Sequence, residues 1–299
     1  MSWEPELEEL ARREALAREM GGEERVARQH ASGRRTVRER IERLFDPGTF
    51  HETGALAGVG AYDDDGELTG FVPANMVCGQ GEIEGRTAVV QGDDFTVRGG
   101  AADAAIWQKM VFAERLAHDL RLPLVRLVDG TGGGGSVKSL EQMGHTYVPF
   151  IPGMELAIAN LARVPVAAAA LGPVAGLGAA RVVASHFSVI VRGTSQLFVA
   201  GPPVVAAAMG ESPDKEALGG SRMQTRAGAV DNEAADEDDA LAQLRRFLSY
   251  LPPSAWELPP IVAGSDPADR REEALLSIVP HDPRKPYACL LYTSPSPRD

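Results

Sequence analysis

Apolar residues recur at helical spacing over the first 45 residues of the chain, among many charged side chains. The segment PELEELARREALAREM shows this pattern, TVRERIERLF resumes it after Gly33, and DPG at residues 46–48 ends it. We therefore predict a helical N-terminal arm over residues 1–32, which packs on a partner or on the main body. A solvated charged helix is an equal alternative for most of this length.

Short apolar runs alternate with helical patterns from about residue 55 onward. The predicted strands are continuous apolar runs such as TAVVQG, as expected where both faces of a sheet are buried. Short runs broken by glycine pairs over residues 71–97 indicate strands joined by turns, with TAVVQG at residues 87–92 as a buried strand. Further strands are predicted at residues 121–130, 164–172 and 187–191, and helical patterns at residues 101–120, 153–163, 173–185 and 237–252. Strands that alternate with helices predict an α/β fold, with a β-sheet core of parallel strands and flanking helices.

Glycines cluster where one of these strands ends, in VDGTGGGGSVKSLEQMG (residues 128–144). We call residues 130–135 the first glycine turn. Glycine permits positive φ and close approach of a ligand, and the N–H groups of such a turn can bind an anion. A Walker phosphate loop is rejected, because Val137 stands where that motif requires glycine before Lys138. An oxyanion hole needs only two N–H groups aimed at one oxygen, and this turn can supply one.

A second glycine cluster follows the next predicted strand, in LGPVAGLGAARVVAS (residues 171–185). We call residues 172–178 the second glycine turn. Tight packing between a helix and a strand explains either turn by itself. Two such turns in one domain, each at the start of a helix, favour a site that combines N–H donors from both.

Composition narrows the classes of function. The chain has 299 residues, of which 44% are hydrophobic, and this is enough for a sizeable core. Its formal net charge of −12 gives no broad attraction for nucleic acid. Cys78 and Cys289 lie far apart without metal-ligand spacing, which argues against a metal site and for a reducing, cytoplasmic compartment. No apolar run approaches the length of a membrane span.

Ionisable residues in recognisable catalytic patterns are scarce. The six histidines form no triad or metal-ligand spacing, and no Gly-x-Ser-x-Gly motif is present. Backbone donors without an obvious side-chain base suit chemistry in which the reacting cofactor supplies the base.

Five segments, taken in order, carry a resemblance to one family. They are GRRTVRERIERLFDPGTFHE (33–52), DDFTVRGGA (93–101), PLVRLVDGTGGGG (123–135), LGPVAGLGAA (171–180) and GTSQLFVAGPPVVAAAMGE (193–211). Together they resemble the N-terminal domain of the carboxyltransferase β subunits of biotin-dependent acyl-CoA carboxylases, which act on propionyl-, acetyl- or methylcrotonyl-CoA.

The resemblance implies a crotonase-like fold and a transfer of the carboxyl group from carboxybiotin to the α-carbon of an acyl-CoA. Biotin would be carried on a separate carrier protein or subunit, and the biotin carboxylase and biotin carboxyl carrier would be partners. The family's subunits form hexamers, so a homo-oligomer is expected. The biotin enolate removes the α-proton, which agrees with the scarcity of side-chain bases, and no metal is expected in this subunit.

The resemblance also divides the chain into segments. Residues 33–255 correspond to the acyl-CoA carboxyltransferase N-terminal domain, and residues 256–288 to a linker toward a missing C-terminal domain. Residues 289–299, CLLYTSPSPRD, are interpreted as a non-native tail. In the family the active site lies between the N-terminal domain of one subunit and the C-terminal domain of another. The chain as given should therefore bind acyl-CoA without completing the reaction.

The site residues are carried over by position in the matching motifs. The backbone N–H groups expected to form the oxyanion hole for the thioester are those of Gly132, Gly133, Gly134, Gly176, Leu177 and Gly178. The residues expected to contact the substrate are Arg98, Gly99, Gly100, Gly172 and Ala175.

The chain departs from the family pattern in places, and three further functions stay open. The first glycine turn is lengthened, Leu177 stands where the family has glycine, and Gln224 stands where many members have histidine. An enoyl-CoA hydratase or isomerase of the same fold would need an acid beside the turns, for which Glu141 is the nearby candidate. The chain could also be a non-catalytic acyl-CoA-binding module, or a decarboxylase subunit of a sodium-pumping complex.

Overall fold

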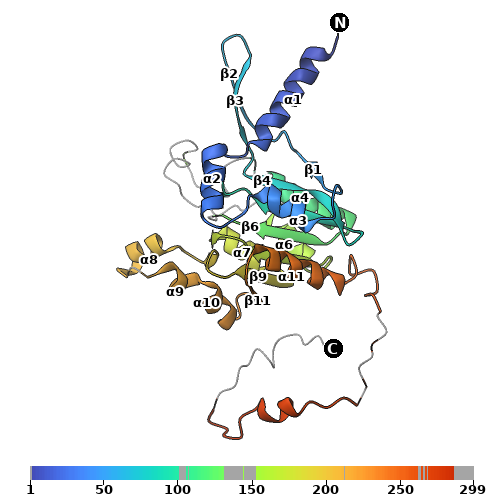
Figure 1. Ribbon diagram of the computed structural model, residues 1–299, viewed down its shortest axis with the longest axis vertical. Helices are drawn as coiled ribbons and strands as arrows, with labels where there is room; N and C mark the ends of the chain where they lie inside the picture. The colour runs from blue at the N-terminus through green and yellow to red at the C-terminus, as the bar shows by residue number, and fades with distance from the viewer. Residues whose placement is uncertain are drawn as a thin grey trace. The chain divides into compact units, whose positions relative to one another are not determined.

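The computed structural model describes residues 2–100, 106, 108–130, 144, 153–211, 213–261, 264, 267 and 269–285 (Figure 1). The chain divides into two compact units, Met1–Pro259 and Pro260–Asp299. The described part of the second unit contains one 3-10 helix, η2 (Glu273–Ser277).

A seven-stranded sheet forms the centre of the described part of the first unit, in the order β1-β4-β5-β6-β7-β9-β11. Its strands are β1 (His51–Thr53), β4 (Met76–Ile83), β5 (Arg86–Asp93), β6 (Leu124–Val128), β7 (Val166–Ala170), β9 (Phe187–Val191) and β11 (Asn232–Ala234). The pairs from β5 to β11 are parallel, and β1 and β4 add an antiparallel edge. The predicted strands and their parallel pairing are confirmed.

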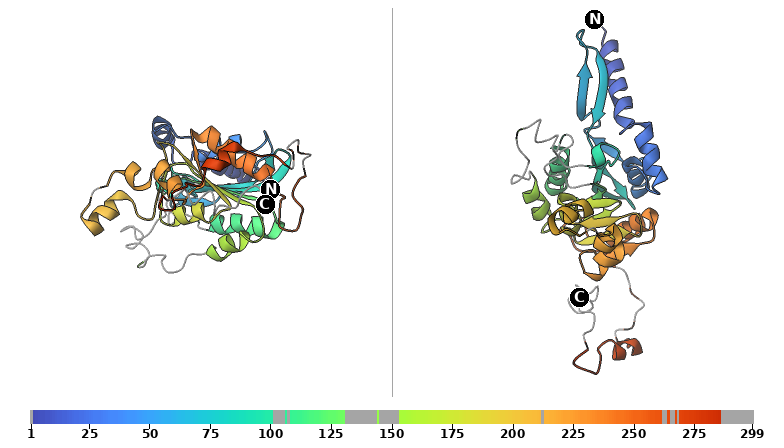
Figure 2. Two further views of the ribbon diagram at one scale, coloured as in Figure 1. Left: turned by 90° about the horizontal axis from the view of Figure 1, so that it is seen from below. Right: turned by 90° about the vertical axis from the view of Figure 1, so that its left-hand side faces the viewer.

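Helices cover both faces of this sheet, as the left view of Figure 2 shows. On one face lie α3 (Val37–Leu44) and α11 (Glu237–Ser249), which contact each other as well as the strands. On the other face lie α4 (Gln108–Leu120), α6 (Met154–Asn160) and α7 (Leu177–Val183). The predicted α/β fold with flanking helices is therefore confirmed. The strands read as continuous apolar runs because they are covered on both sides, and all five residues of β7 are buried.

The N-terminal arm consists of α1 (Glu4–Arg18) and α2 (Glu23–Ala31). Along α1, Ala17 is the one residue classed as buried, and Trp3 is 76% exposed, so the interpretation as a solvated charged helix fits most of this helix. The α2 helix instead packs on the body, where Gln29 is 3% exposed. The helix that follows the arm, α3, begins with a capping box formed by Thr36 and Glu39, the sequence signal that marks its start.

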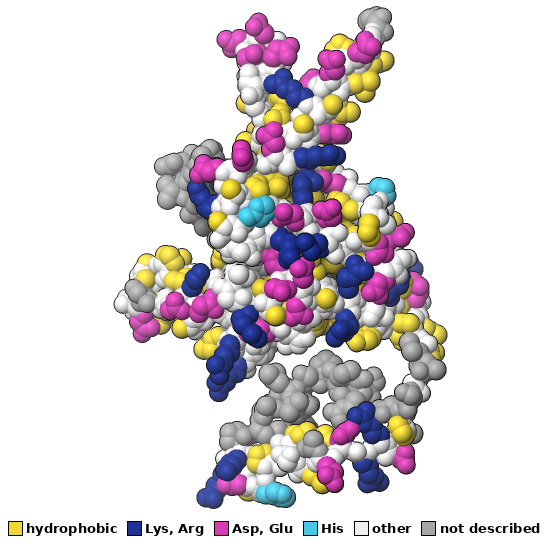
Figure 3. Space-filling view, viewed as in Figure 1, with side chains coloured by type: hydrophobic (Ala, Val, Ile, Leu, Met, Phe, Trp, Pro, Cys, Tyr) yellow, Lys and Arg dark blue, Asp and Glu magenta, His cyan; other side chains and the backbone are white. Residues whose placement is uncertain are grey.

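β2 (Gly58–Tyr62) was not among the predicted strands, whereas the end of β3 (Leu68–Pro73) lies in the predicted strand region. The two strands form a hairpin. The right view of Figure 2 shows it running beside α1, and the Arg13 guanidinium lies 5.6 Å from the centre of the Tyr62 ring. Acidic side chains gather at the outer end of the hairpin in Figure 3, where the sequence has Asp63, Asp64 and Asp65.

A projecting segment of short elements follows β9. It contains β10 (Gln196–Phe198), which pairs with β8 (Pro173–Ala175), and the helices α8 (Pro202–Met209), α9 (Lys215–Gly219) and α10 (Ser221–Arg226). After α11, Trp256 stacks against Arg121 and Arg163, so the chain stays on the first unit past the predicted boundary at residue 255. None of the described helices combines the length and hydropathy needed to cross a bilayer.

Candidate functional site

The carboxyl ends of β5, β6 and β7 lie side by side, because the three strands are parallel neighbours. A glycine-containing segment follows each strand: η1 (Arg98–Gly100) after β5, the first glycine turn after β6, and the second glycine turn after β7. A Cβ atom added to Gly100 would lie 2.4 Å from the Asp129 carbonyl oxygen, and one added to Gly130 would lie 2.4 Å from the Gly100 carbonyl oxygen. These two backbones approach so closely that neither position can hold a side chain.

The start of the first glycine turn also contacts the second. The Ala175 N–H donates to the Gly130 carbonyl oxygen at 3.3 Å, and a Cβ atom on Gly178 would lie 3.0 Å from the same oxygen. The described parts of the two turns are therefore in contact, through Gly130 of the first turn and Ala175 and Gly178 of the second. The predicted donors Gly132, Gly133 and Gly134 lie outside the described residues.

The second glycine turn contributes fewer available donors than the sequence predicts. The Gly176 N–H donates to the Phe198 carbonyl oxygen at 3.1 Å, so the prediction that this group is a free oxyanion donor is wrong for this conformation. For the N–H groups of Leu177 and Gly178, the described residues supply no hydrogen-bond acceptor. Gly176 has φ 57° and ψ −119°, a conformation that favours glycine and turns the chain into α7.

The predicted substrate contacts differ in accessibility. Arg98 is exposed, and Arg98, Gly99 and Gly100 all have positive φ, so this short segment bends sharply above the sheet edge. Ala175 is half-buried beside the Gly130 carbonyl. Gly172 is buried, and a Cβ atom there would lie 2.0 Å from Asp129 Oδ1, so this glycine is required for packing against an interior carboxylate.

A buried charge cluster under the turns was missed by the sequence reasoning. Asp129 is fully buried, and its carboxylate accepts from Gln29 Nε2 at 3.0 Å, Arg34 Nη1 at 2.8 Å and Arg40 Nη1 at 2.8 Å. Arg40 also donates to Glu237. Burial opposes the Arg40 charge, but the carboxylates of Asp129 and Glu237 overcome this effect, and the pKa of Arg40 is raised.

A second buried pair anchors the helix after the second glycine turn. Arg181 on α7 donates to Asp93 at the end of β5 at 2.8 Å, and to the Gln91 side chain at 2.8 Å. Burial raises the pKa of Asp93 despite the attraction of Arg181. The pair ties α7 to the same sheet edge as Asp129, whose N–H donates to Asp93 at 3.3 Å.

Three carboxylates described around the turns are paired with arginines. Asp93 and Asp129 are paired as above, and Glu114, which lies with Leu177 around a small hollow, is paired with Arg126 at 2.8 Å. A hydratase-type acid would have to be free to exchange a proton with substrate. Glu141, the candidate acid for hydratase chemistry, lies outside the described residues.

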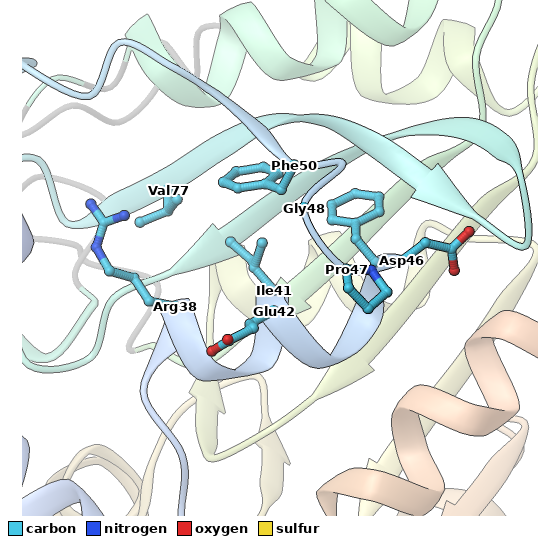
Figure 4. Close-up of a pocket in the computed structure, with 9 residues that line it drawn as sticks. Arg38, Ile41, Glu42, Asp46, Pro47, Gly48, Phe50 and Val77 are labelled. Carbon is cyan, nitrogen blue, oxygen red and sulfur yellow. The ribbon is translucent and has the colours of Figure 1, made fainter.

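A separate cavity of about 340 Å³ lies between α3 and β4 (Figure 4). Ile41, Phe45, Phe50 and Val77 form its apolar wall, and none of the predicted site residues lines it. Across the residues that the structure describes, no group of three His, Cys, Asp or Glu side chains could hold a metal ion.

Comparisons with known proteins identify the family to which the chain belongs. The family model described as the carboxyl transferase domain matches residues 28–290. The carboxyltransferase subunit of propionyl-CoA carboxylase from Haloferax mediterranei is 33% identical, over 96% of this chain and 55% of its own length. The alpha subunit of methylmalonyl-CoA decarboxylase from Veillonella parvula is 31% identical, over 94% of this chain and 54% of its own length.

A solved structure of transcarboxylase 12S superimposes with a TM-score of 0.75 at 29% identity, covering 96% of this chain and 55% of that one. It is described as a hexamer with methylmalonyl-coenzyme A and methylmalonic acid bound. Fold and turns together thus define a crotonase-like α/β protein. The chain belongs to the carboxyl transferase domain family, and it spans about half the length of the relatives it matches.

Proposed function

We propose that this chain is the acyl-CoA-binding half of a carboxyltransferase subunit of a biotin-dependent acyl-CoA carboxylase. The complete subunit would transfer a carboxyl group from carboxybiotin to the α-carbon of an acyl-CoA. Membership of the carboxyl transferase family supports this assignment. The observation that carries it is the meeting of Gly130 with the second glycine turn, beside the N–H groups of Leu177 and Gly178.

Removal of the α-proton places negative charge on the thioester oxygen, and the proposed site stabilises that charge with backbone N–H groups. Leu177 and Gly178 would supply donors from the second turn, and the first turn would supply the other. A donor placed in advance at such an oxygen lowers the barrier by about 3–4 kcal/mol, since it needs no reorientation as the charge develops. Leucine can replace glycine at position 177, because the contribution is the N–H and not the side chain.

The base would come from the second substrate. Three described carboxylates near the turns, Asp93, Glu114 and Asp129, are already bonded to arginines. Carboxybiotin supplies both the carboxyl group and the base when its carrier protein presents it. The carrier, a biotin carboxylase subunit and further copies of this chain are therefore the proposed partners, and the cytoplasm is the proposed location.

A decarboxylase subunit is the second candidate. The similarity to the alpha subunit of methylmalonyl-CoA decarboxylase favours it, at 31% identity. That reaction also requires a stabilised thioester enolate, so the same turns would serve it. The two candidate functions can be distinguished in a complete subunit. The rate of carboxyl transfer from a malonyl-type CoA to biotin is compared with the rate of carboxyl transfer from carboxybiotin to an acyl-CoA.

Binding of a thioester to the chain itself tests the proposal. Propionyl-CoA labelled with 13C at the thioester carbonyl should bind more tightly than CoA, with its carbonyl stretch moved to lower frequency. Leu177→Pro deletes one N–H at the first position of α7, where proline is tolerated. The loss of one hydrogen bond of about 1 kcal/mol should weaken propionyl-CoA about fivefold and reduce the frequency shift.

Leu177→Ala is the matched control, since it removes the same side chain and keeps the N–H. Equal affinity and equal carbonyl frequency in the proline and alanine variants, with both folded by circular dichroism, would reject the oxyanion role of residue 177. Hydration of crotonyl-CoA by the chain would instead support hydratase chemistry.

A further inference from the structure

The backbone hydrogen bonds between β6 and β7 end just before the two glycine turns begin. Val128 pairs with Ala170, and the Leu171 N–H donates to the Val128 carbonyl oxygen at 2.9 Å. Asp129 follows β6, Gly172 follows Leu171 after β7, and both segments continue directly into the turns. Beyond these strands the Ala175 N–H donates to the Gly130 carbonyl oxygen at 3.3 Å, and a side chain adds a second link at the point where the turns start.

Arg40 makes this second link. Arg40, from α3, is 1% exposed and donates from Nη1 to Asp129 Oδ2 at 2.8 Å and from Nη2 to the Leu171 carbonyl oxygen at 2.8 Å. The first acceptor immediately precedes Gly130, and the second immediately precedes Gly172. We infer that Arg40 is a positioning residue, whose guanidinium sets the spacing between Asp129 and Leu171 and so the place of the Leu177 and Gly178 N–H groups beside Gly130.

The guanidinium is itself held in one place. Glu237 accepts from Nε at 3.0 Å and from Nη2 at 2.7 Å, so both sides of the planar group are bonded. Asp129 is held in turn by Gln29 and Arg34. Little space remains for rearrangement, because the Asp129–Arg34 pair lies against the Cα of Gly172.

A lysine at position 40 cannot form the same set of hydrogen bonds. A guanidinium presents five N–H donors in a rigid fork, whereas an ammonium is a point charge on a flexible stem. Arg40→Lys keeps the positive charge beside Asp129 and Glu237 but loses the fixed bridge to Leu171. The variant therefore separates the positioning role from the simple compensation of buried charge.

Arg86→Lys is the matched control. Arg86 also uses its guanidinium to bind main-chain oxygens, those of Leu248 and Leu251, but it lies at the start of β5, the end of that strand far from the turns. Both variants exchange a bridging arginine for lysine. Only Arg40→Lys should move the turns.

Two measurements test the inference. The first is independent of the proposed function, and the second rests on it. First, amide chemical shifts of Gly130, Leu177 and Gly178 are compared without ligand in the wild type and both variants. These chemical shifts should change in Arg40→Lys and keep their wild-type values in Arg86→Lys. Second, the affinity ratio of propionyl-CoA to CoA should fall about fivefold or more in Arg40→Lys and by less than about twofold in Arg86→Lys, because small displacements of binding groups have large effects.

Unchanged amide shifts in Arg40→Lys would overturn the positioning role, whatever the affinities. Equal losses of propionyl-CoA and CoA binding would also overturn it, since a general loss of stability weakens both ligands alike. A wild type that does not prefer propionyl-CoA over CoA would instead refute the proposed function and leave the amide comparison to decide the positioning role. If Arg40→Lys does not fold, Asp129→Asn, which keeps the side-chain shape, replaces it in both measurements.

Discussion

Gly172→Ala gives the sharpest test of how the glycine turns are packed. The added Cβ would lie 2.0 Å from Asp129 Oδ1 and 2.4 Å from Arg34 Nη1. An ordinary contact needs about 3.4 Å, so the carboxylate would have to move by roughly 1.4 Å, and the 2.8 Å Arg34–Asp129 hydrogen bond could not persist. Backbone strain does not contribute, because Gly172 does not have positive φ.

The expected loss of stability follows from two known ranges. Overpacking a core costs about 1–3 kcal/mol, and removing one partner of a buried ion pair costs about 3–5 kcal/mol. Arg40 and Gln29 still hold the other carboxylate oxygen, so we expect about 3 kcal/mol, at the boundary of the two ranges. For a unit of this size that corresponds to a fall in Tm of roughly 6–12 °C.

Urea unfolding and thermal unfolding measure this loss. Gly70→Ala is the control, because its Cβ would meet only Ala61 at 3.9 Å, an ordinary contact, at a half-buried position of β3. The control should change stability by less than about 1 kcal/mol. A Gly172→Ala protein with nearly wild-type stability would show that the second glycine turn does not lie against Asp129.

Two further predictions concern other parts of the fold. Thr36→Ala removes the capping box of α3 and should lower the free energy of unfolding by about 1 kcal/mol in urea, whereas Thr36→Ser should preserve it. Burial raises the pKa of the Cys78 thiol to about 11, so the unfolded chain releases this proton at lower pH than the folded one. Stability should therefore fall as pH rises past about 8.5, by about 1–2 kcal/mol at pH 10, and Cys78→Ala should lack this component.

Strand positions could be predicted because burial on both faces leaves a clear pattern. The five residues of β7 are all apolar and all buried, and the parallel order follows from the alternation of strands and helices. The β2 strand escaped prediction because it contains two glycines and has no buried residue, so no apolar run marks it.

The candidate site was predictable in location but not in detail. Parallel strands bring their carboxyl ends together, so two glycine turns after neighbouring strands must lie close. Sequence does not show which way an N–H points, and this is why Gly176 was wrongly expected to be a free donor. The Arg40–Asp129 contact joins residues 89 positions apart, and no local pattern in the sequence reports a pairing at that distance.

The residues of the buried charge cluster come from distant parts of the sequence, and this has a consequence for folding during translation. Gln29, Arg34 and Arg40 leave the ribosome long before Asp129, Leu171 and Glu237, with which they bond. The cluster cannot be complete until nearly the whole first unit has been translated, since Glu237 follows Arg40 by 197 positions. Completion of this cluster is thus a late event of co-translational folding, and a nascent chain stalled before α11 should leave its first 40 residues more open to protease than they are in the complete unit.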